Sequence, residues 1–149
     1  MRPVSVITNF FERKEQKQLL FEQRALLELT LSDVAKSVRK SFFAFTDRSE
    51  FVRRELEETS IDTAIDAYLN GVSYSKFYDL GETEEQVSKR ARKELNEFIE
   101  MLYDYWMLWS EYDYLPEELH KACQAFVEQW WRIGFQKGIK LQRLKRRWH

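Results

Sequence analysis

Apolar residues recur at three- and four-residue spacing along most of the chain, which is the period of an amphipathic α-helix. The pattern predicts helices over about 9–29, 30–45, 47–70, 83–110 and 116–145. Helix-forming residues dominate these segments, and helix breakers lie in the gaps between them. The sequence is therefore expected to form an all-α, single-domain bundle of about five helices.

Capping residues mark several of the predicted boundaries. Thr83 and Gln86 have the spacing of a capping box, in which each side chain bonds the other residue's backbone N–H. Pro116 fits the first position of a helix, and Gly71 fits a C-terminal cap. These signals place a helix end at about residue 70 and helix starts at about 83 and 116.

The segment 71–82 does not show a clean helical pattern, and it is expected to be a long loop. It carries three aromatic residues, Tyr74, Phe77 and Tyr78. A long loop with apolar side chains either packs them onto the bundle or uses them in binding. Both interpretations stay open, with packing as the simpler one.

The link over 111–115 is short, and short links join antiparallel neighbours. We therefore expect the last two helices to form a long antiparallel C-terminal hairpin at the centre of the core. If both helices rise equally from the turn, Gly134 lies near Arg92 and Gly138 near Ser88. The two glycines share one face and would allow a close approach there.

The composition describes one well-filled domain. The chain has 149 residues, 44% of them hydrophobic, which suffices for a real core and for a single domain over 1–149. The ends, about 1–8 and 146–149, are expected to be flexible. Only four glycines and two prolines make a turn-rich β-fold or a glycine-loop nucleotide fold a poor match.

Charge and cysteine usage limit the partners and the compartment. The 24 Lys and Arg nearly balance the 25 Asp and Glu, so general nucleic-acid binding is not expected. No apolar run approaches the length of a transmembrane helix, and no export signal is recognised at the N-terminus. With a single cysteine, Cys123, these features predict a cytoplasmic protein.

The charges are unevenly distributed along the C-terminal half. Residues 94–118 contain eight acidic residues and no Lys or Arg, whereas residues 137–149 contain six basic residues and no acid. The basic segment is amphipathic, so it could contact an anionic partner, a lipid surface or RNA. The simpler interpretation, which we favour, is that these cations only complement the negative C-terminal end of the last helix. Its candidate contact residues are Lys140, Arg143, Arg146, Arg147 and Trp148.

Some acidic residues, three of them within 94–118, raise the possibility of a magnesium site. Carboxylates one turn apart on facing helices can hold Mg²⁺ in all-α phosphate-ester hydrolases, because this ion prefers oxygen ligands. Such spacing also arises by chance in a chain rich in glutamate, and no cofactor is predicted. The metal-ligand candidates are Asp62, Asp66, Glu97, Glu100 and Asp104.

Three stretches of the chain together resemble a known family. They read Ile61-Asp62-x-Ala64-Ile65-x-Ala67-Tyr68-Leu69-x-Gly71, then Gly81-Glu82, then Ala125-Phe126-x-x-x-Trp130-Trp131-x-x-Gly134-Phe135. This pattern resembles the YbaK-like proteins of spore-forming bacilli, a family of unknown function distinct from the prolyl-tRNA editing domain of the same name. The resemblance covers about 15–147 and implies a small cytoplasmic helical protein, and it supplies no activity, cofactor or catalytic residue that could be carried over. The positions to which it points are Asp62, Asp66, Tyr68, Gly81, Glu82 and Trp131.

The leading hypothesis is a non-enzymatic protein-interaction or regulatory module that binds a protein partner or itself as a homodimer. The many aromatic residues exceed what a small core needs, and exposed aromatic surface often marks an interface. One alternative is a Mg²⁺-dependent nucleotide or other phosphate-ester hydrolase. A further alternative is docking of the basic tail on an anionic membrane or RNA. The interaction candidates are Tyr74, Phe77, Tyr78 and Trp131, together with Lys140, Arg143, Arg146, Arg147 and Trp148.

Overall fold

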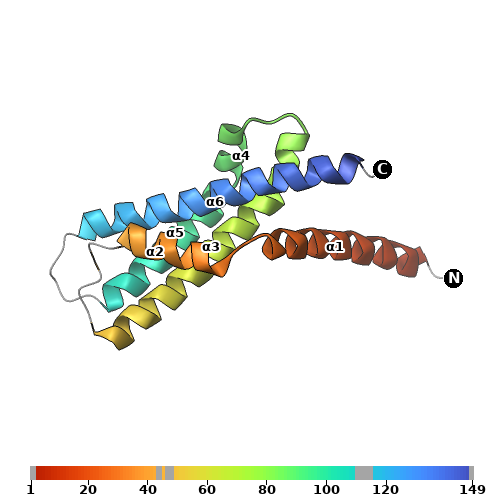
Figure 1. The fold of residues 1–149 in the computed structure, drawn as a ribbon. Helices are drawn as coiled ribbons and strands as arrows, with labels where there is room; N and C mark the ends of the chain where they lie inside the picture. Colours follow the sequence, from red (N-terminus) through yellow and green to blue (C-terminus); the bar gives the residue numbers. More distant parts are fainter. Residues whose placement is uncertain (1–2, 43–44, 46–48, 110–115, 148–149) are drawn as a thin grey trace.

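The computed structural model describes residues 3–42, 45, 49–109 and 116–147, and for residues 3–11, 146 and 147 it describes the backbone alone. These ranges contain only helices and their connections, so the predicted all-α class is confirmed (Figure 1). The six helices are α1 (Pro3–Leu27), α2 (Leu31–Phe42), α3 (Glu50–Asp79), α4 (Glu84–Arg90), α5 (Arg92–Leu108) and α6 (Pro116–Arg147).

The helix predicted over 83–110 is two helices, and this accounts for the sixth element. Its start is confirmed, because the Thr83 hydroxyl accepts from the Gln86 N–H at 3.2 Å and the Gln86 side chain accepts from the Thr83 N–H. The break lies at buried Ala91, whose ψ of −2° departs from the helical value near −42°. The chain changes direction there, and α4 leaves the line of α5 (Figure 1).

The prediction of a loop over 71–82 is wrong, because α3 continues through Gly71 to Asp79. The helix ends about two and a half turns later than expected, at a Schellman motif around Gly81. Gly81 has a φ of +104°, the Gly81 N–H donates to the Tyr78 carbonyl, and the Glu82 N–H donates to the Phe77 carbonyl at 3.1 Å. Gly71 is therefore not a C-terminal cap. It lies where α3 contacts α6.

That contact joins α3 to α6, which run parallel and touch backbone to backbone. A Cβ atom on Gly71 would lie 2.1 Å from the Trp131 carbonyl oxygen, and one on Gly134 would lie 1.9 Å from that of Tyr68. A Cβ on Gly138 would lie 2.3 Å from the Ser75 hydroxyl. Only glycine leaves room for helices this close, so the three glycines form one small-residue contact.

The expectation that Gly134 and Gly138 face Arg92 and Ser88 is therefore wrong. The antiparallel hairpin of α5 and α6 exists, but α5 lies on another side of α6 and in a shifted register (Figure 1). Arg92 forms an ion pair with Glu128 at 2.9 Å instead. Helices α3, α5 and α6 together form the centre of the bundle, and α3 rather than α5 is the main neighbour of α6.

Helix α2 covers one end of this centre and supplies aromatic contacts. Phe42 stacks on Trp106 with ring centroids 4.6 Å apart and meets Phe126 edge-on. The buried indoles of Trp106 and Trp130 both have hydrogen-bond partners. Trp106 Nε1 donates to the Ser60 hydroxyl and Trp130 Nε1 to the Ser37 hydroxyl, each at 3.0 Å.

Among the described side chains, the contacts that hold helix α1 to the bundle lie in its C-terminal half, and the start of the helix projects away (Figure 1). The Tyr68 hydroxyl donates to the Ala25 carbonyl at 2.8 Å, and Lys137 pairs with Glu28 at 2.9 Å. In the part of the chain that the structure describes, no helix combines the length and apolar character that crossing a bilayer requires.

Gly134→Ala should destabilise the fold by about 3 kcal/mol, the upper end of the usual cost of overpacking. The new methyl group would collide with the Tyr68 backbone, which cannot rotate away as a side chain can. Helix propensity alone would favour alanine by about 1 kcal/mol. Urea unfolding followed by circular dichroism measures the change.

Gly138→Ala is the matched comparison, because its nearest neighbour is the Ser75 side chain, and its loss should be smaller. A Gly134→Ala variant as stable as the wild type would contradict the backbone contact.

Candidate functional site

A polar groove runs between α3 and the α4–α5 segment, with α1 along one edge. It consists of two adjoining cavities of about 530 Å³ each, which share Ser73, Tyr74 and Glu94. We call it the aromatic–acidic groove. Its lining residues are Glu22, Asp66, Leu69, Asn70, Ser73, Tyr74, Lys76, Phe77, Arg90, Glu94 and Phe98.

The groove forms because two rows of residues at four-residue spacing face each other. Asp66, Asn70 and Tyr74 follow one another along α3, and Glu94 and Phe98 lie on the facing side of α5. Residues four apart share a helix face, so each row presents its side chains to the same space. The row on α3 exists only because this helix continues past Gly71.

A hydrogen-bond chain connects the groove to the core. Trp131 is 3% exposed, and its Nε1 donates to the Asn70 Oδ1 at 2.9 Å. The Asn70 amide then donates to the Glu94 carboxylate. Burial, followed by the charge of Glu94 and a hydrogen bond to it, raises the pKa of Tyr74. Glu94 therefore accepts a hydrogen bond from Asn70 and lines the same cavities as Tyr74, so its neighbours in the groove belong to α3.

Arg90 closes one end of the groove. Its Nε donates to both Glu82 carboxylate oxygens, at 2.7 and 2.9 Å, and its guanidinium lies 4.4 Å from the centre of the Phe77 ring. The hydrogen bond from Arg90 lowers the pKa of Glu82. The turn at Gly81 brings Glu82 next to Arg90. Gly81 and Glu82 are two of the positions to which the family resemblance points, and both therefore have a structural role.

The other end of the groove is acidic. Glu22 of α1 and Asp66 of α3 line the same cavity as Glu94. Burial, and then the negative charge of Asp62 one turn away, raises the pKa of Asp66. A raised carboxyl pKa means that this environment disfavours the ionised form. Glu22, Asp66 and Glu94 together make this end of the groove anionic.

The five metal-ligand candidates are not brought together into a buried site. Asp62, Asp66, Glu97, Glu100 and Asp104 are all exposed. Glu100 lies 2.6 Å from the His120 Nε2, and of the five only Asp66 lines the groove. Among the residues that the structure describes, no group of three His, Cys, Asp or Glu side chains is placed to hold a metal ion.

The aromatic interaction candidates divide between groove, core and surface. Tyr74 and Phe77 line the groove with their rings 5.7 Å apart. Trp131 lies in the core, stacked on Phe135 at 5.2 Å, and reaches the groove only through Asn70. Tyr78 is 40% exposed and meets Phe135 edge-on.

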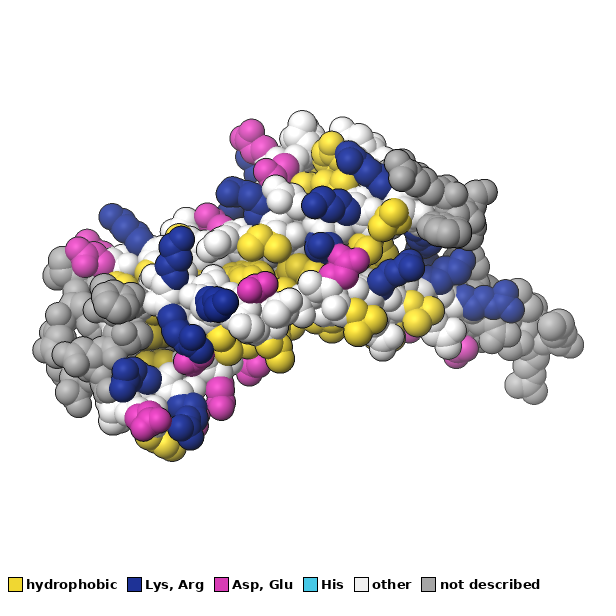
Figure 2. All heavy atoms as spheres, in the orientation of Figure 1, with side chains coloured by type: hydrophobic (Ala, Val, Ile, Leu, Met, Phe, Trp, Pro, Cys, Tyr) yellow, Lys and Arg dark blue, Asp and Glu magenta, His cyan; other side chains and the backbone are white. Residues whose placement is uncertain are grey.

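The basic candidates lie at the free end of α6. Lys140 and Arg143 are exposed, and exposed Leu144 lies beside them. Figure 2 shows Lys and Arg side chains along α6 and α2 on the face in view. The side chains of Arg146 and Arg147 and the whole of Trp148 lie outside the described part of the chain.

Sequence reasoning missed Asn70, Arg90 and Glu94 as groove residues. The available signal was their spacing, since Asn70 is one turn from Asp66 and Tyr74, and Glu94 is one turn from Arg90. The interpretation of 71–82 as a loop hid that signal, because it removed Tyr74 from the row on α3.

The all-α bundle and its groove define the chain as a small helical protein. The chain matches the model of a family described as a protein of unknown function (DUF2521) over residues 4–147, and it belongs to that family. It is 28% identical over 144 residues to the uncharacterized protein YbaK of Bacillus subtilis (strain 168), covering 95% of this chain and 98% of the relative. The resemblance seen in the sequence is thus confirmed. No solved structure matches the chain significantly.

Asp66→Asn should raise the melting temperature at neutral pH. Because the pKa of Asp66 in the folded state lies above the ordinary value of 3.8, the ionised carboxylate destabilises the folded protein at pH values above that folded-state pKa. This destabilisation is absent below pH 3.8, where the carboxyl group is protonated in both the folded and the unfolded state. The variant and the wild type should therefore converge as the pH falls towards 3.8. Thermal unfolding across this pH range measures the difference.

Asp33→Asn is the control, because Asp33 lies in the first turn of α2, where a carboxylate stabilises the helix. It should not raise the melting temperature. If Asp66→Asn lowered stability at neutral pH, the acidic end of the groove would already be neutralised by a cation.

Proposed function

We propose that the protein is a non-enzymatic interaction module that associates with itself. In this proposal the basic end of α6 from one copy lies in the aromatic–acidic groove of a second copy. The observation that carries it is the lining of the groove, where the carboxylates of Glu22, Asp66 and Glu94 share one cavity with the rings of Tyr74 and Phe98. A site of this kind binds a segment that is both cationic and apolar.

The groove supplies complementary chemistry for such a segment. Glu22 and Asp66 offer carboxylates at its acidic end, and Tyr74 and Phe98 offer half-buried rings beside them. Aromatic centres with charged rims are typical of protein interfaces.

The end of α6 carries the matching pattern. Lys140 and Leu144 are one turn apart and share a helix face, with Arg143 beside them. All three side chains are exposed. A leucine flanked by cations can place its apolar part against the rings and its charges near Glu22 and Asp66.

The occupant is expected to come from another copy rather than from the same chain. Helix α6 is continuous, and its contact with α3 at Gly134 and Gly138 fixes its direction. Gln142 is still held by a hydrogen bond to Ser75 at 3.0 Å, so the basic end cannot fold back into its own groove. A reciprocal exchange between two copies would give a closed dimer.

Sedimentation velocity of two charge-reversal variants tests this proposal. Lys140→Glu/Arg143→Glu and Glu22→Lys/Asp66→Lys should each weaken self-association by about tenfold or more, because like charges would then face each other. An equal mixture of the two variants should associate again, since each supplies the surface that complements the other. Raising the salt concentration should weaken the wild-type dimer.

Lys36→Glu/Lys40→Glu is the matched control, because both lysines are exposed on α2 and the change in charge is the same. It should leave association unchanged. A wild type that stays monomeric at high concentration would overturn the proposal. So would a monomer whose α6 end binds anionic vesicles in a salt-dependent manner, because that end would then serve a lipid surface.

A further inference from the structure

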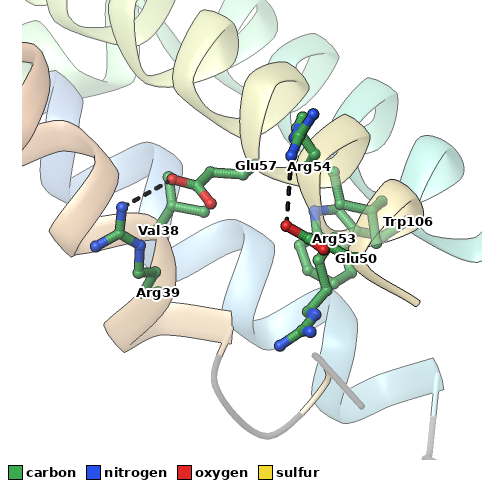
Figure 3. A pocket seen from close by; sticks show the side chains of 8 residues that line it. Val38, Arg39, Glu50, Arg53, Arg54, Glu57 and Trp106 are labelled. Carbon is green, nitrogen blue, oxygen red and sulfur yellow. Dashed lines mark hydrogen bonds and ion pairs between the residues drawn. The ribbon is translucent and has the colours of Figure 1, made fainter. Parts of the chain in front are cut away.

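A second cleft lies at the opposite end of α3, where α2, the start of α3 and Trp106 of α5 meet (Figure 3). Its volume is about 490 Å³, within the range of small-molecule sites. We call it the arginine cleft. Its lining residues are Val38, Arg39, Glu50, Arg53, Arg54, Leu56, Glu57 and Trp106.

Three arginines from two helices line this cleft. Arg39 pairs with Glu57 at 3.2 Å and Arg54 pairs with Glu50 at 3.4 Å, as the dashed lines in Figure 3 mark. Both arginines are about two-thirds exposed, and pairs of this kind contribute little to stability. Among the residues that the structure describes, Arg53 makes no ion pair. These guanidinium groups can therefore turn to an incoming anion at little cost.

The floor of the cleft is apolar. Val38, Leu56 and Trp106 are each at most 3% exposed, and they line the cleft beneath the arginines. Trp106 is held in place by its hydrogen bond to Ser60 and by the stacked ring of Phe42. The rim carries three arginines against two glutamates, which leaves one positive charge in excess. The methylene groups of the arginines supply apolar surface above the nearly inaccessible floor. This arrangement is complementary to a molecule with an anionic head and an apolar stem.

We propose that the arginine cleft binds a small aliphatic anion, with a carboxylate or phosphate head and a stem of medium length. The planar guanidinium forms paired hydrogen bonds to either head, and the stem lies against the methylene groups of the arginines within the cleft. The site is independent of the aromatic–acidic groove, because it uses Glu50–Glu57 of α3 and the groove uses Asp66–Phe77.

The test uses octanoate and octyl phosphate as probes and the tryptophan indoles as reporters. In ¹H–¹⁵N spectra the Trp106 indole signal, assigned with Trp106→Phe, should shift on titration with either probe. The Trp131 indole signal should stay, because Trp131 lies at the groove end of α3. Comparison of the two titrations identifies which anionic head the cleft prefers. Octanol and inorganic phosphate should each bind at least about tenfold more weakly, because each lacks half of the recognised chemistry.

Arg53→Gln and Arg39→Gln should each weaken octanoate binding about tenfold, the loss expected for one charge-assisted hydrogen bond. Both arginines are exposed, so the variants should retain the fold. Arg143→Gln, the same change at the end of α6, is the control and should bind octanoate as the wild type does. Equal binding of octanol, or octanoate binding that persists in both cleft variants, would overturn the proposal.

Discussion

The parallel contact between α3 and α6 determines how the other helices can be arranged. Gly71, Gly134 and Gly138 remove the side chains that would otherwise hold the two backbones apart. The two backbones are in direct contact there instead of packing through side chains, so adding even one methyl group would force the helices apart. The Tyr68 carbonyl and the Ser75 hydroxyl occupy the space that those methyl groups would need.

The groove depends on this contact in two ways. First, α3 remains helical through Gly71, so Tyr74 and Phe77 continue the face that begins at Asp66. Second, Trp131 lies at the contact and donates to Asn70, which donates to Glu94. One side of the groove is therefore tied to the core of the protein, while Glu22 on α1 belongs to a helix held mainly at its C-terminal part.

The two ends of α3 have different chemical character. The groove end offers carboxylates beside aromatic rings, and Arg90 is already occupied by Glu82. The opposite end offers arginines over a floor formed by buried Trp106. Because α3 is one continuous helix, binding at the two ends involves one rigid element. The near-neutral net charge of −1 hides this separation of cationic and anionic surfaces.

The sequence alone determined the helical class and most of the helix starts. Thr83 with Gln86 and Pro116 act through their own backbone neighbours, so local pattern was sufficient. The sequence pattern also carried the family resemblance, which the match over residues 4–147 confirmed. It identified aromatic and acidic residues such as Tyr74 and Asp66 without showing that they share a groove.

Tertiary structure decided what Gly71 does and which helix lies against α6. A glycine after an amphipathic segment looks the same in sequence whether it caps the helix or allows a second backbone to approach. Gly71 does the latter, and Gly81, with its φ of +104°, ends the helix. A short link indicates that the two helices it joins lie side by side, but no short link joins α3 to α6, which are far apart in sequence. Their contact depends on shape complementarity in three dimensions, which no local pattern encodes.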